Sequence, residues 1–338
     1  MPKILIVAPN WIGDALLAEP LFARLRKKSP GVVIDALAPA WTAPVLRRMP
    51  EIDEVIESDF VHGDLRLADR WRLGRGLRAR GYDEAIVLPN TFKAALIPFF
   101  AEVPLRAGFV GESRYGLLNL VHKLDEKRVP LMAERYAQLA EKPGEPAARP
   151  LPEVRLRVDE ANLVISLGRL GLSRANPVAA FCPGAEYGPA KRWPARHFAA
   201  LAKKLAARGY AVWLFGSGSD RPIGDEIARL AQGAAVNICG KTDLAAAIDL
   251  LSLAEVVVSN DSGLMHVAAG LGRPVVALYG SSSPEHTPPL GHSRIVRTGI
   301  ECSPCFAREC PLGHFKCMNE LTPERVLSEI AAVDAHVQ

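Results

Sequence analysis

The sequence predicts an α/β protein built from two doubly wound, Rossmann-like domains that face each other across a cleft. Its 338 residues exceed what one small hydrophobic core supports and suit two domains of ordinary size. Short apolar runs alternate with helical patterns, which is typical of a parallel sheet covered on both faces. This alternation occurs twice, on either side of a proline-rich stretch, and therefore predicts two such sheets.

The first series opens with an apolar strand expected at residues 3–8, and a polar loop follows it. The other expected elements of this half are strands at 33–38 and 84–88 and helices at 15–28, 65–80 and 91–100. The prolines of residues 143–152 exclude a continuous helix or central strand, so we expect a linker or boundary loop there.

The second series starts with a strand expected at residues 178–182. The remaining elements expected are helices at 194–208, 220–231, 244–253 and 262–271 and strands at 210–215, 236–239, 255–259 and 274–279. Thr322-Pro323 has the pattern of a helix start and predicts one last helix. We expect domains at 1–172 and 173–321, with the segment 322–338 packing back on the first domain.

Composition excludes several classes of protein. Hydrophobic residues make up 49% of the chain and charged residues 23%, as in a soluble globular protein. The net charge of +4 is too small to predict nucleic-acid binding. Neither a signal peptide nor a run of about 20 apolar residues is visible. We therefore expect a cytoplasmic protein that contacts a membrane only peripherally.

The stretch SNDSGLMHVAAG, residues 259–270, follows the apolar run 256–258. A strand, a short turn and a small-residue helix form a frame that directs a helix N-terminus at an anion. Asp261 stands at that position, where it would either contact the ligand or cap the helix.

Two further loops of the second half carry polar residues after a strand. Residues 183–194, PGAEYGPAKRWP, place Lys191 and Arg192 among glycines that allow close backbone approach, and a lysine suits a diphosphate. A solvated basic loop is the alternative. Gly216-Ser217-Gly218 lacks the third glycine of a dinucleotide fingerprint, so Asp220 is expected to cap a helix or to bind a ribose hydroxyl.

The first half repeats this geometry in APNWIGDALLAEP, where Gly13 frees the backbone and Asp14 lies at a strand-to-helix turn. Asp14 would act either as a helix N-cap or as a base that takes a proton from an attacking hydroxyl. Lys93 follows a strand end in the same half, and the arginines between residues 66 and 80 scatter over more than one helix face.

Four cysteines lie close together near the end of the chain, at Cys302, Cys305, Cys310 and Cys317. In a cytoplasmic protein this spacing favours thiolate metal ligands over disulfides, although zinc sites more often pair two C-x2-C units. A structural zinc or iron ion that staples a loop is one expectation, and an unmetallated cluster is the other.

Five segments together resemble glycosyltransferase family 9, whose members have the GT-B fold. They are APNWIGDALLAEPLF, APAWTAPVLRRMPEIDEVI, VLPNTFKAALIPFF, CPGAEYGPAKRWP and SNDSGLMHVAAGLGRPVVALYG. The resemblance runs from residue 3 to about residue 290 and resumes in the last helix. It implies inverting transfer of L-glycero-D-manno-heptose from ADP-heptose to the first heptose of heptosyl-Kdo2-lipid A, with no cofactor required for catalysis.

The resemblance also implies roles for particular residues. Asp14 matches the base that deprotonates the acceptor, and Lys191 matches the lysine that neutralises the diphosphate. The donor-binding residues we expect are Gly13, Glu186, Tyr187, Arg192, Asp220, Asp261, Ser262, Gly263 and His266. The cations we expect at the acceptor are Lys93, Arg114 and Arg135. The cysteines are not part of the catalytic pattern of the family.

Three other functions remain open from the sequence. A nucleotide-sugar epimerase of the same architecture would change ADP-heptose without an acceptor. A non-catalytic binding module would be organised by the cysteine cluster. A dehydrogenase is disfavoured because no complete GxGxxG occurs.

Overall fold

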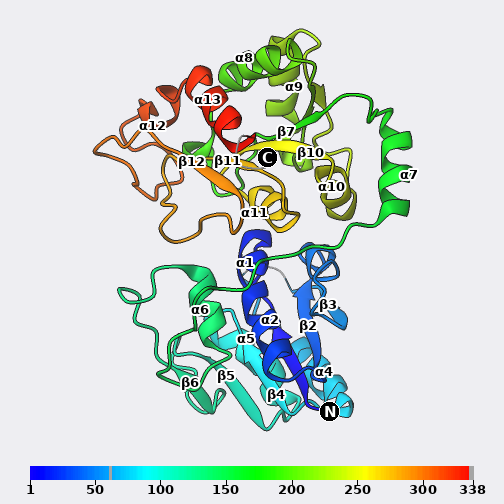
Figure 1. Cartoon of the computed structure of the whole chain (residues 1–338). Helices are drawn as coiled ribbons and strands as arrows, with labels where there is room; N and C mark the ends of the chain where they lie inside the picture. Colours follow the sequence, from blue (N-terminus) through cyan, green and yellow to red (C-terminus); the bar gives the residue numbers. More distant parts are fainter. Residues whose placement is uncertain (61–62, 335–338) are drawn as a thin grey trace. The chain divides into compact units, whose positions relative to one another are not determined.

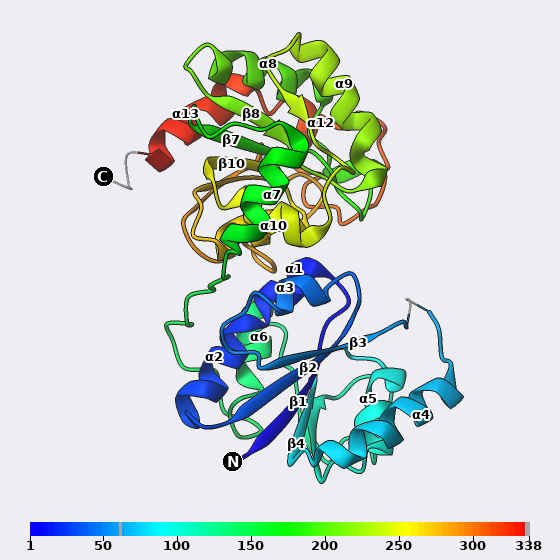
Figure 2. The ribbon, with the colours of Figure 1, turned by 90° about the vertical axis from the view of Figure 1, so that its right-hand side faces the viewer.

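The computed structural model describes residues 1–60 and 63–334, which form two compact units, Met1–Val154 and Arg155–Gln338 (Figure 1). Each unit contains one six-stranded sheet, and the neighbouring strands of both sheets are parallel. Helices cover both faces of each sheet (Figures 1 and 2). The prediction of two doubly wound α/β sheets is therefore confirmed.

The sheet of the first unit has the order β3-β2-β1-β4-β5-β6. Its strands are β1 (Lys3–Val7), β2 (Val33–Pro39), β3 (Glu54–Ser58), β4 (Glu84–Val87), β5 (Leu105–Phe109) and β6 (Leu120–His122). Its helices are α1 (Ile12–Leu17), α2 (Glu19–Lys28), α3 (Ala43–Leu46), α4 (Leu67–Leu77), the 3-10 turn η1 (Arg78–Arg80), α5 (Phe92–Phe100) and α6 (Met132–Gln138). Helices α1, α2 and α6 cover one face, while α4 and α5 pack together on the other.

The sheet of the second unit has the order β12-β11-β10-β7-β8-β9. Its strands are β7 (Val178–Cys182), β8 (Ala211–Leu214), β9 (Val236–Asn237), β10 (Ala254–Asn260), β11 (Val275–Leu278) and β12 (Ser293–Val296). Its helices are α7 (Glu160–Leu170), α8 (Ala195–Ala206), α9 (Arg221–Ala231), α10 (Leu244–Leu251), α11 (Gly263–Gly270), α12 (Lys316–Asn319) and α13 (Pro323–Asp334). The 3-10 turns are η2 (Pro189–Lys191) and η3 (Gly218–Asp220).

Local sequence explains where the elements begin and end. The helix expected at residues 15–28 is two helices, because Pro20 occupies the first turn of α2 and Ala18 separates it from α1. Strand β10 is apolar and buried along Val256–Val258, as a central strand of a parallel sheet requires. Trp193 anchors the core of the second unit, where it is fully buried and its indole N–H donates to the Leu321 carbonyl at 2.7 Å.

Two features of the division differ from the expected domains. The boundary between the units falls between Val154 and Arg155 rather than after residue 172. Helix α7 lies in the second unit, where it packs against α10. Helix α13 packs against α8, β11 and β12 of the second unit, so it belongs to that unit instead of forming a separate segment. Residues 335–338 of the expected C-terminal segment lie outside the described residues.

Candidate active site

Each sheet has a topological switch point, where chain connections leave in opposite directions from two adjacent strands. In the first unit this point lies between β1 and β4, and in the second it lies between β7 and β10. Ligands of doubly wound proteins bind beyond the carboxyl ends of the strands at such points. The loops after these four strands are therefore the candidate sites.

A pocket of about 250 Å³ lies at the first switch point. Residues that follow β1 and β4 form one wall, and residues around α6 form the other. Its lining is Pro9, Asn10, Trp11, Asp14, Leu88, Pro89, Asn90, Phe109, Leu124, Glu126, Met132, Arg135 and Tyr136. The pocket thus combines two carboxylates, a guanidinium and side-chain amides with an apolar wall, which is the composition of a site for a polar small molecule.

Asp14 lies in the first turn of α1 and is half-buried. The N-cap of this helix is Trp11, so the structure does not use Asp14 as an N-cap, one of the two roles expected for it. Burial raises the pKa of the nearby Tyr136 hydroxyl, and the negative charge of Asp14 raises that pKa further. Tyr136 therefore stays protonated at neutral pH.

The three cations expected at the acceptor are placed differently. Arg135 lines the pocket beside Asp14 and donates to the Val129 carbonyl at 2.8 Å. Arg114 is only 1% exposed. Burial lowers the pKa of Arg114 to about 10. Lys93 lies in the first turn of α5 and is not among the residues that line this pocket.

The buried position of Arg114 corrects its expected role. Its guanidinium donates to the Pro89 and Phe109 carbonyls at 2.7 Å and to the side-chain oxygen of Asn90 at 3.1 Å. These bonds hold the loop after β4, which lines the pocket. We therefore interpret Arg114 as a residue that positions this loop rather than one that contacts the acceptor.

At the second switch point, Lys191 and Asp261 form an ion pair with a distance of 2.5 Å between Nζ and Oδ2. Lys191 comes from the loop after β7, and Asp261 directly follows β10. Both side chains are largely buried. The pair explains how a carboxylate can lie beside a candidate anion-binding position, because the ammonium group neutralises it.

Asn260 joins the two loops of this switch point. It is fully buried, accepts a hydrogen bond from the Trp193 backbone N–H at 3.0 Å and donates to the Pro183 carbonyl at 2.7 Å. Both ends of the loop at residues 183–193, which we call the donor loop, are thus held by one side chain. The sequence did not predict this role of Asn260, although the residue directly precedes Asp261 in the segment expected to bind an anion.

Helix α11 starts at Gly263, and Ser262 occupies its N-cap position without a side-chain capping bond. Asp261 is therefore not the cap of this helix, which corrects one of its expected uses. His266 lies in the following turn and is only 6% exposed. Burial lowers its pKa to about 4, a shift that Asp261 opposes and Lys191 reinforces. His266 is consequently neutral at pH 7.

Asp220 occupies the N-cap position of α9 but makes no side-chain capping bond to it, so this expected role is not confirmed. Its carboxylate instead belongs to a capping box with Ser217, at the start of η3. Its Oδ2 accepts hydrogen bonds from the Ser217 backbone N–H at 3.0 Å and from the Ser217 hydroxyl at 2.8 Å. The other oxygen, Oδ1, is buried and lacks a hydrogen-bond partner among the described atoms. A Cβ on Gly184 would lie 2.5 Å from this carboxyl group, so the donor loop needs a glycine there.

The other expected donor-binding residues occupy the rims of the two switch points. Glu186 and Tyr187 are exposed on the donor loop. Arg192 donates weakly to the Ala185 carbonyl, at 3.4 Å. Gly13 lies in α1 beside Asp14, in the first unit. The structure therefore assigns Gly13 to the first switch point and the other three to the second.

The four clustered cysteines line one small cavity of about 20 Å³. Backbone N–H groups, first that of Phe315, lower the pKa of Cys310. Burial raises the pKa of Cys317, and the proximity of the other three thiols raises it further. Among the described residues, no group of three or more His, Cys, Asp or Glu side chains is arranged to hold a metal ion. The structure thus gives no support to the expected zinc or iron centre.

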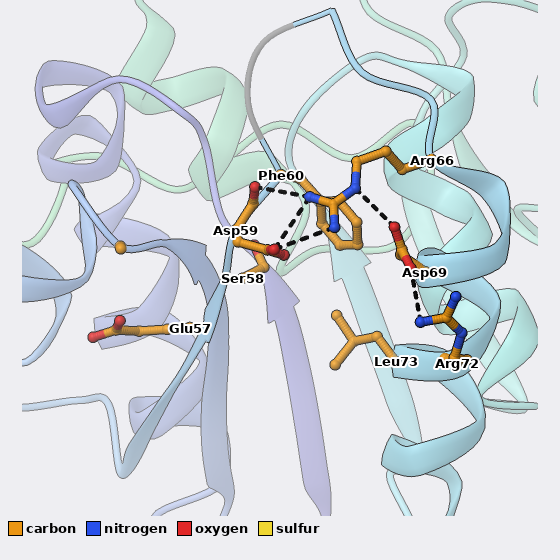
Figure 3. A pocket seen from close by; sticks show the side chains of 9 residues that line it. Glu57, Ser58, Asp59, Phe60, Arg66, Asp69, Arg72 and Leu73 are labelled. Atoms are coloured by element: carbon orange, nitrogen blue, oxygen red, sulfur yellow. Dashed lines mark hydrogen bonds and ion pairs between the residues drawn. The ribbon is translucent and has the colours of Figure 1, made fainter.

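A larger pocket of about 430 Å³ lies beside the carboxyl end of β3 (Figure 3). Its charged side chains pair with one another: Arg66 bonds to Asp59 and Asp69, and Arg72 bonds to Asp69. The Arg66 guanidinium also lies 5.3 Å from the centre of the Phe60 ring. Because it lies at the edge strand β3 and away from the switch point, we do not interpret this pocket as the active site.

Several pocket residues had no signal in the sequence. Tyr136, Met132 and Glu126 reach the first switch point only because β6 and α6 return the chain beside α1 and α2. Asn10, Trp11 and Asn90 stood within quoted segments but were not singled out. Their signal was position, since each follows the end of a central strand.

Two doubly wound domains, each with a candidate site at its switch point, have the architecture of the GT-B class of enzymes. Residues 70–316 match the profile of glycosyltransferase family 9 (heptosyltransferase), and the chain belongs to this family. The chain is thus a glycosyltransferase, and the GT-B expectation is confirmed.

Individual relatives agree with this assignment. The chain is 45% identical to lipopolysaccharide heptosyltransferase 2 of Escherichia coli over 341 residues, covering 98% of each chain. It is 43% identical to lipooligosaccharide heptosyltransferase 2 of Haemophilus influenzae, covering 97% of this chain and 98% of that one. The solved structure of E. coli ADP-heptose lps heptosyltransferase II matches with a TM-score of 0.89 at 43% identity, over 99% of both chains. Heptose transfer is therefore supported over the epimerase, dehydrogenase and binding-module alternatives.

Proposed function

We propose that this enzyme transfers L-glycero-D-manno-heptose from ADP-heptose to the first heptose of heptosyl-Kdo2-lipid A, with inversion at the anomeric carbon. The names of the relatives support the donor and the core-oligosaccharide acceptor. The observation that carries the mechanism is the position of Asp14 in the pocket of the first switch point, on a rigid helix turn. Inversion in one displacement needs one base for the acceptor hydroxyl, and a single carboxylate suffices.

The first unit binds the acceptor in this proposal. Asp14 accepts the proton of the attacking hydroxyl, and the protonated Tyr136 lies beside it. Arg135 supplies positive charge for the phosphate or carboxylate groups of the acceptor. Lys93 is a candidate for the same task farther along α5.

The second unit binds ADP-heptose. The N-terminus of α11, with the backbone N–H groups of Ser262 and Gly263, faces the diphosphate, and Lys191 adds an ammonium charge. Asp261 bonds to Lys191 and fixes its position, and its remaining oxygen is available to the heptose hydroxyls. Charge that develops on the leaving diphosphate is stabilised by these preorganised groups, so catalysis needs no cofactor.

The remaining donor-site residues have supporting roles. Glu186, Tyr187 and Arg192 form the rim of the donor loop, and the neutral His266 packs behind Asp261 and Lys191. The orphaned oxygen of Asp220 suits a ribose hydroxyl. Gly13 belongs with Asp14, because its lack of a side chain leaves the turn accessible.

The acceptor is a membrane lipid, so we propose that the enzyme works at the cytoplasmic face of the inner membrane by peripheral contact. No helix in the described part of the chain is long and apolar enough to cross a bilayer. The net charge of +4 suits a surface that carries anionic lipid.

The test is transfer in vitro with ADP-heptose and purified heptosyl-Kdo2-lipid A, followed by linkage analysis of the product. We expect one added heptose, of inverted anomeric configuration, on the first heptose. Incubation with ADP-heptose alone should leave the sugar unchanged. Epimerisation in that control, or transfer to a different acceptor position, would contradict the proposal.

A further inference from the structure

The segment of residues 301–315, which we call the Cys-rich loop, lies directly against the donor loop. The Ala190 backbone N–H donates to the Arg308 carbonyl at 3.0 Å, and the Tyr187 hydroxyl donates to the Phe306 carbonyl at 2.8 Å. A Cβ on Gly188 would lie 2.4 Å from the Arg308 carbonyl oxygen. The two loops are therefore in backbone contact that only glycine allows at position 188.

The Cys-rich loop is anchored on its other side to the segment that follows β11. The Ser303 hydroxyl donates to the Gly280 carbonyl at 2.6 Å, and the Phe306 backbone N–H donates to the Ser281 carbonyl at 2.6 Å. Its cysteines converge on the small cavity described above, which Ala190 and Ser281 also line. The backbone at Arg308 is thus fixed relative to the carboxyl ends of the strands.

This anchoring places the Arg308 side chain at the Tyr187 ring, which Lys191 also contacts. The Arg308 guanidinium lies 5.2 Å from the centre of the Tyr187 ring, and the Lys191 ammonium lies 5.1 Å from the same centre. Lys191 is neutralised by Asp261, whereas Arg308 is exposed and forms no ion pair with any described residue. Of the two cations at the Tyr187 ring, Lys191 is therefore paired and Arg308 is not.

We propose that Arg308 is a second diphosphate-binding residue of the donor site, presented by the Cys-rich loop. This inference rests on the proposed function, which places the diphosphate next to Lys191. A diphosphate carries more negative charge than one shared ammonium offsets, and a guanidinium binds phosphate oxygens through two parallel hydrogen bonds. Tyr187 holds the guanidinium by a cation–π contact until the ligand arrives.

The experiment compares ADP with adenosine, because the two ligands differ in the diphosphate alone. Dissociation constants for both are measured by titration calorimetry with the parent enzyme, Arg308→Ala and Arg308→Lys. Arg208→Ala is the matched control. Arg208 is also exposed in the second unit, but it precedes β8 and so lies at the amino ends of the strands, away from the donor loop. We expect Arg308→Ala to weaken ADP binding about tenfold or more and to leave adenosine binding unchanged.

The remaining variants should rank in one order. Arg308→Lys keeps the charge without the bidentate geometry, so its ADP affinity should lie between those of the parent and Arg308→Ala. Arg208→Ala should match the parent for both ligands. Unchanged ADP affinity in Arg308→Ala overturns this proposal alone. An equal loss for adenosine and ADP also overturns it, because the residue would then only support the loop. A parent enzyme that transfers no heptose and binds no ADP overturns the proposed function and this inference together.

Discussion

The two units have the same parallel-sheet topology around their switch points, yet the sites built there are opposite in character. The first switch point is an open pocket that contains a carboxylate, and Arg114 holds one of its walls from behind. The second is the donor loop, which Asn260 holds in place. Its Lys191 is already paired with Asp261, which follows β10. The topology thus fixes where a ligand binds, and the residues after two strands decide which ligand.

This difference matches the two tasks of a glycosyl transfer. An acceptor hydroxyl needs a base and space, which the first pocket supplies in the proposed mechanism. A departing diphosphate needs fixed positive charge and N–H donors, which a rigid cationic loop and the start of α11 supply. The following substitutions affect one of these two tasks at a time, so each tests whether the tasks are divided between the two units.

Asp14→Asn should have the largest effect. It removes the base but keeps the shape of the side chain, so transfer should fall by about 10²–10⁴-fold. Affinity for ADP should not change, because the donor groups lie in the second unit. Initial rates and ADP titrations measure both quantities, and Glu145→Gln, an exposed carboxylate of the same unit, is the control. A variant that retains transfer would show that Asp14 serves the local structure only.

Lys191→Ala should come next, with turnover reduced by about 10²–10³-fold. The loss should fall mostly on kcat, because charge on the diphosphate grows as it departs. Lys203→Ala, at the end of α8, is the matched control. Turnover within twofold of the parent would remove Lys191 from the mechanism.

Asp261→Asn changes the other partner of the ion pair and separates ADP binding from recognition of the heptose. The amide no longer neutralises Lys191, so ADP binding should survive or strengthen, while recognition of the heptose weakens. We expect a higher KM for ADP-heptose together with an undiminished affinity for ADP. Equal losses for both ligands would contradict a sugar-binding role for Asp261.

The sequence predicted the fold because buried parallel strands have a strong signature. Runs such as Ile4–Val7 and Val256–Val258 are apolar, short and followed by turn residues, and both are central strands. Strands β3, β5, β6 and β12 were not predicted, because each has only three to five residues, some of them exposed or half-buried, and therefore carries little hydrophobic pattern.

The candidate site was predictable only in part, for a physical reason. Asp14, Lys191 and Asp261 follow central strands, so sequence position alone placed them at the switch points. Arg114 was expected to face the acceptor because of its charge, whereas its two terminal nitrogens donate to four carbonyl and amide oxygens in the interior. The contact of Arg308 with the donor loop depends on how a distant loop folds back, which no local pattern records.

The smallest expected effect is on the free energy of unfolding, and it follows from the burial of His266 in the second unit. Because His266 has a folded-state pKa of about 4, the unfolded chain binds more protons than the native chain between pH 4 and 6.5. Stability of the second unit should therefore fall as the pH decreases through this window, by about 1 kcal/mol per pH unit. His266→Gln removes the titrating group, so this part of the loss should disappear.

Urea unfolding at pH 7 and pH 5 measures this effect, with tryptophan fluorescence as the probe. Trp193 and Trp213 are buried in the second unit, whereas Trp11, Trp41 and Trp71 of the first unit are exposed, so the signal reports mainly on the second unit. His292→Gln is the control, since that histidine is more exposed and lies at the start of β12. Equal pH sensitivity in the parent and His266→Gln would mean that burial of His266 does not govern the acid stability of this unit. The second site would then be less tightly packed than its contrast with the open pocket of the first unit implies.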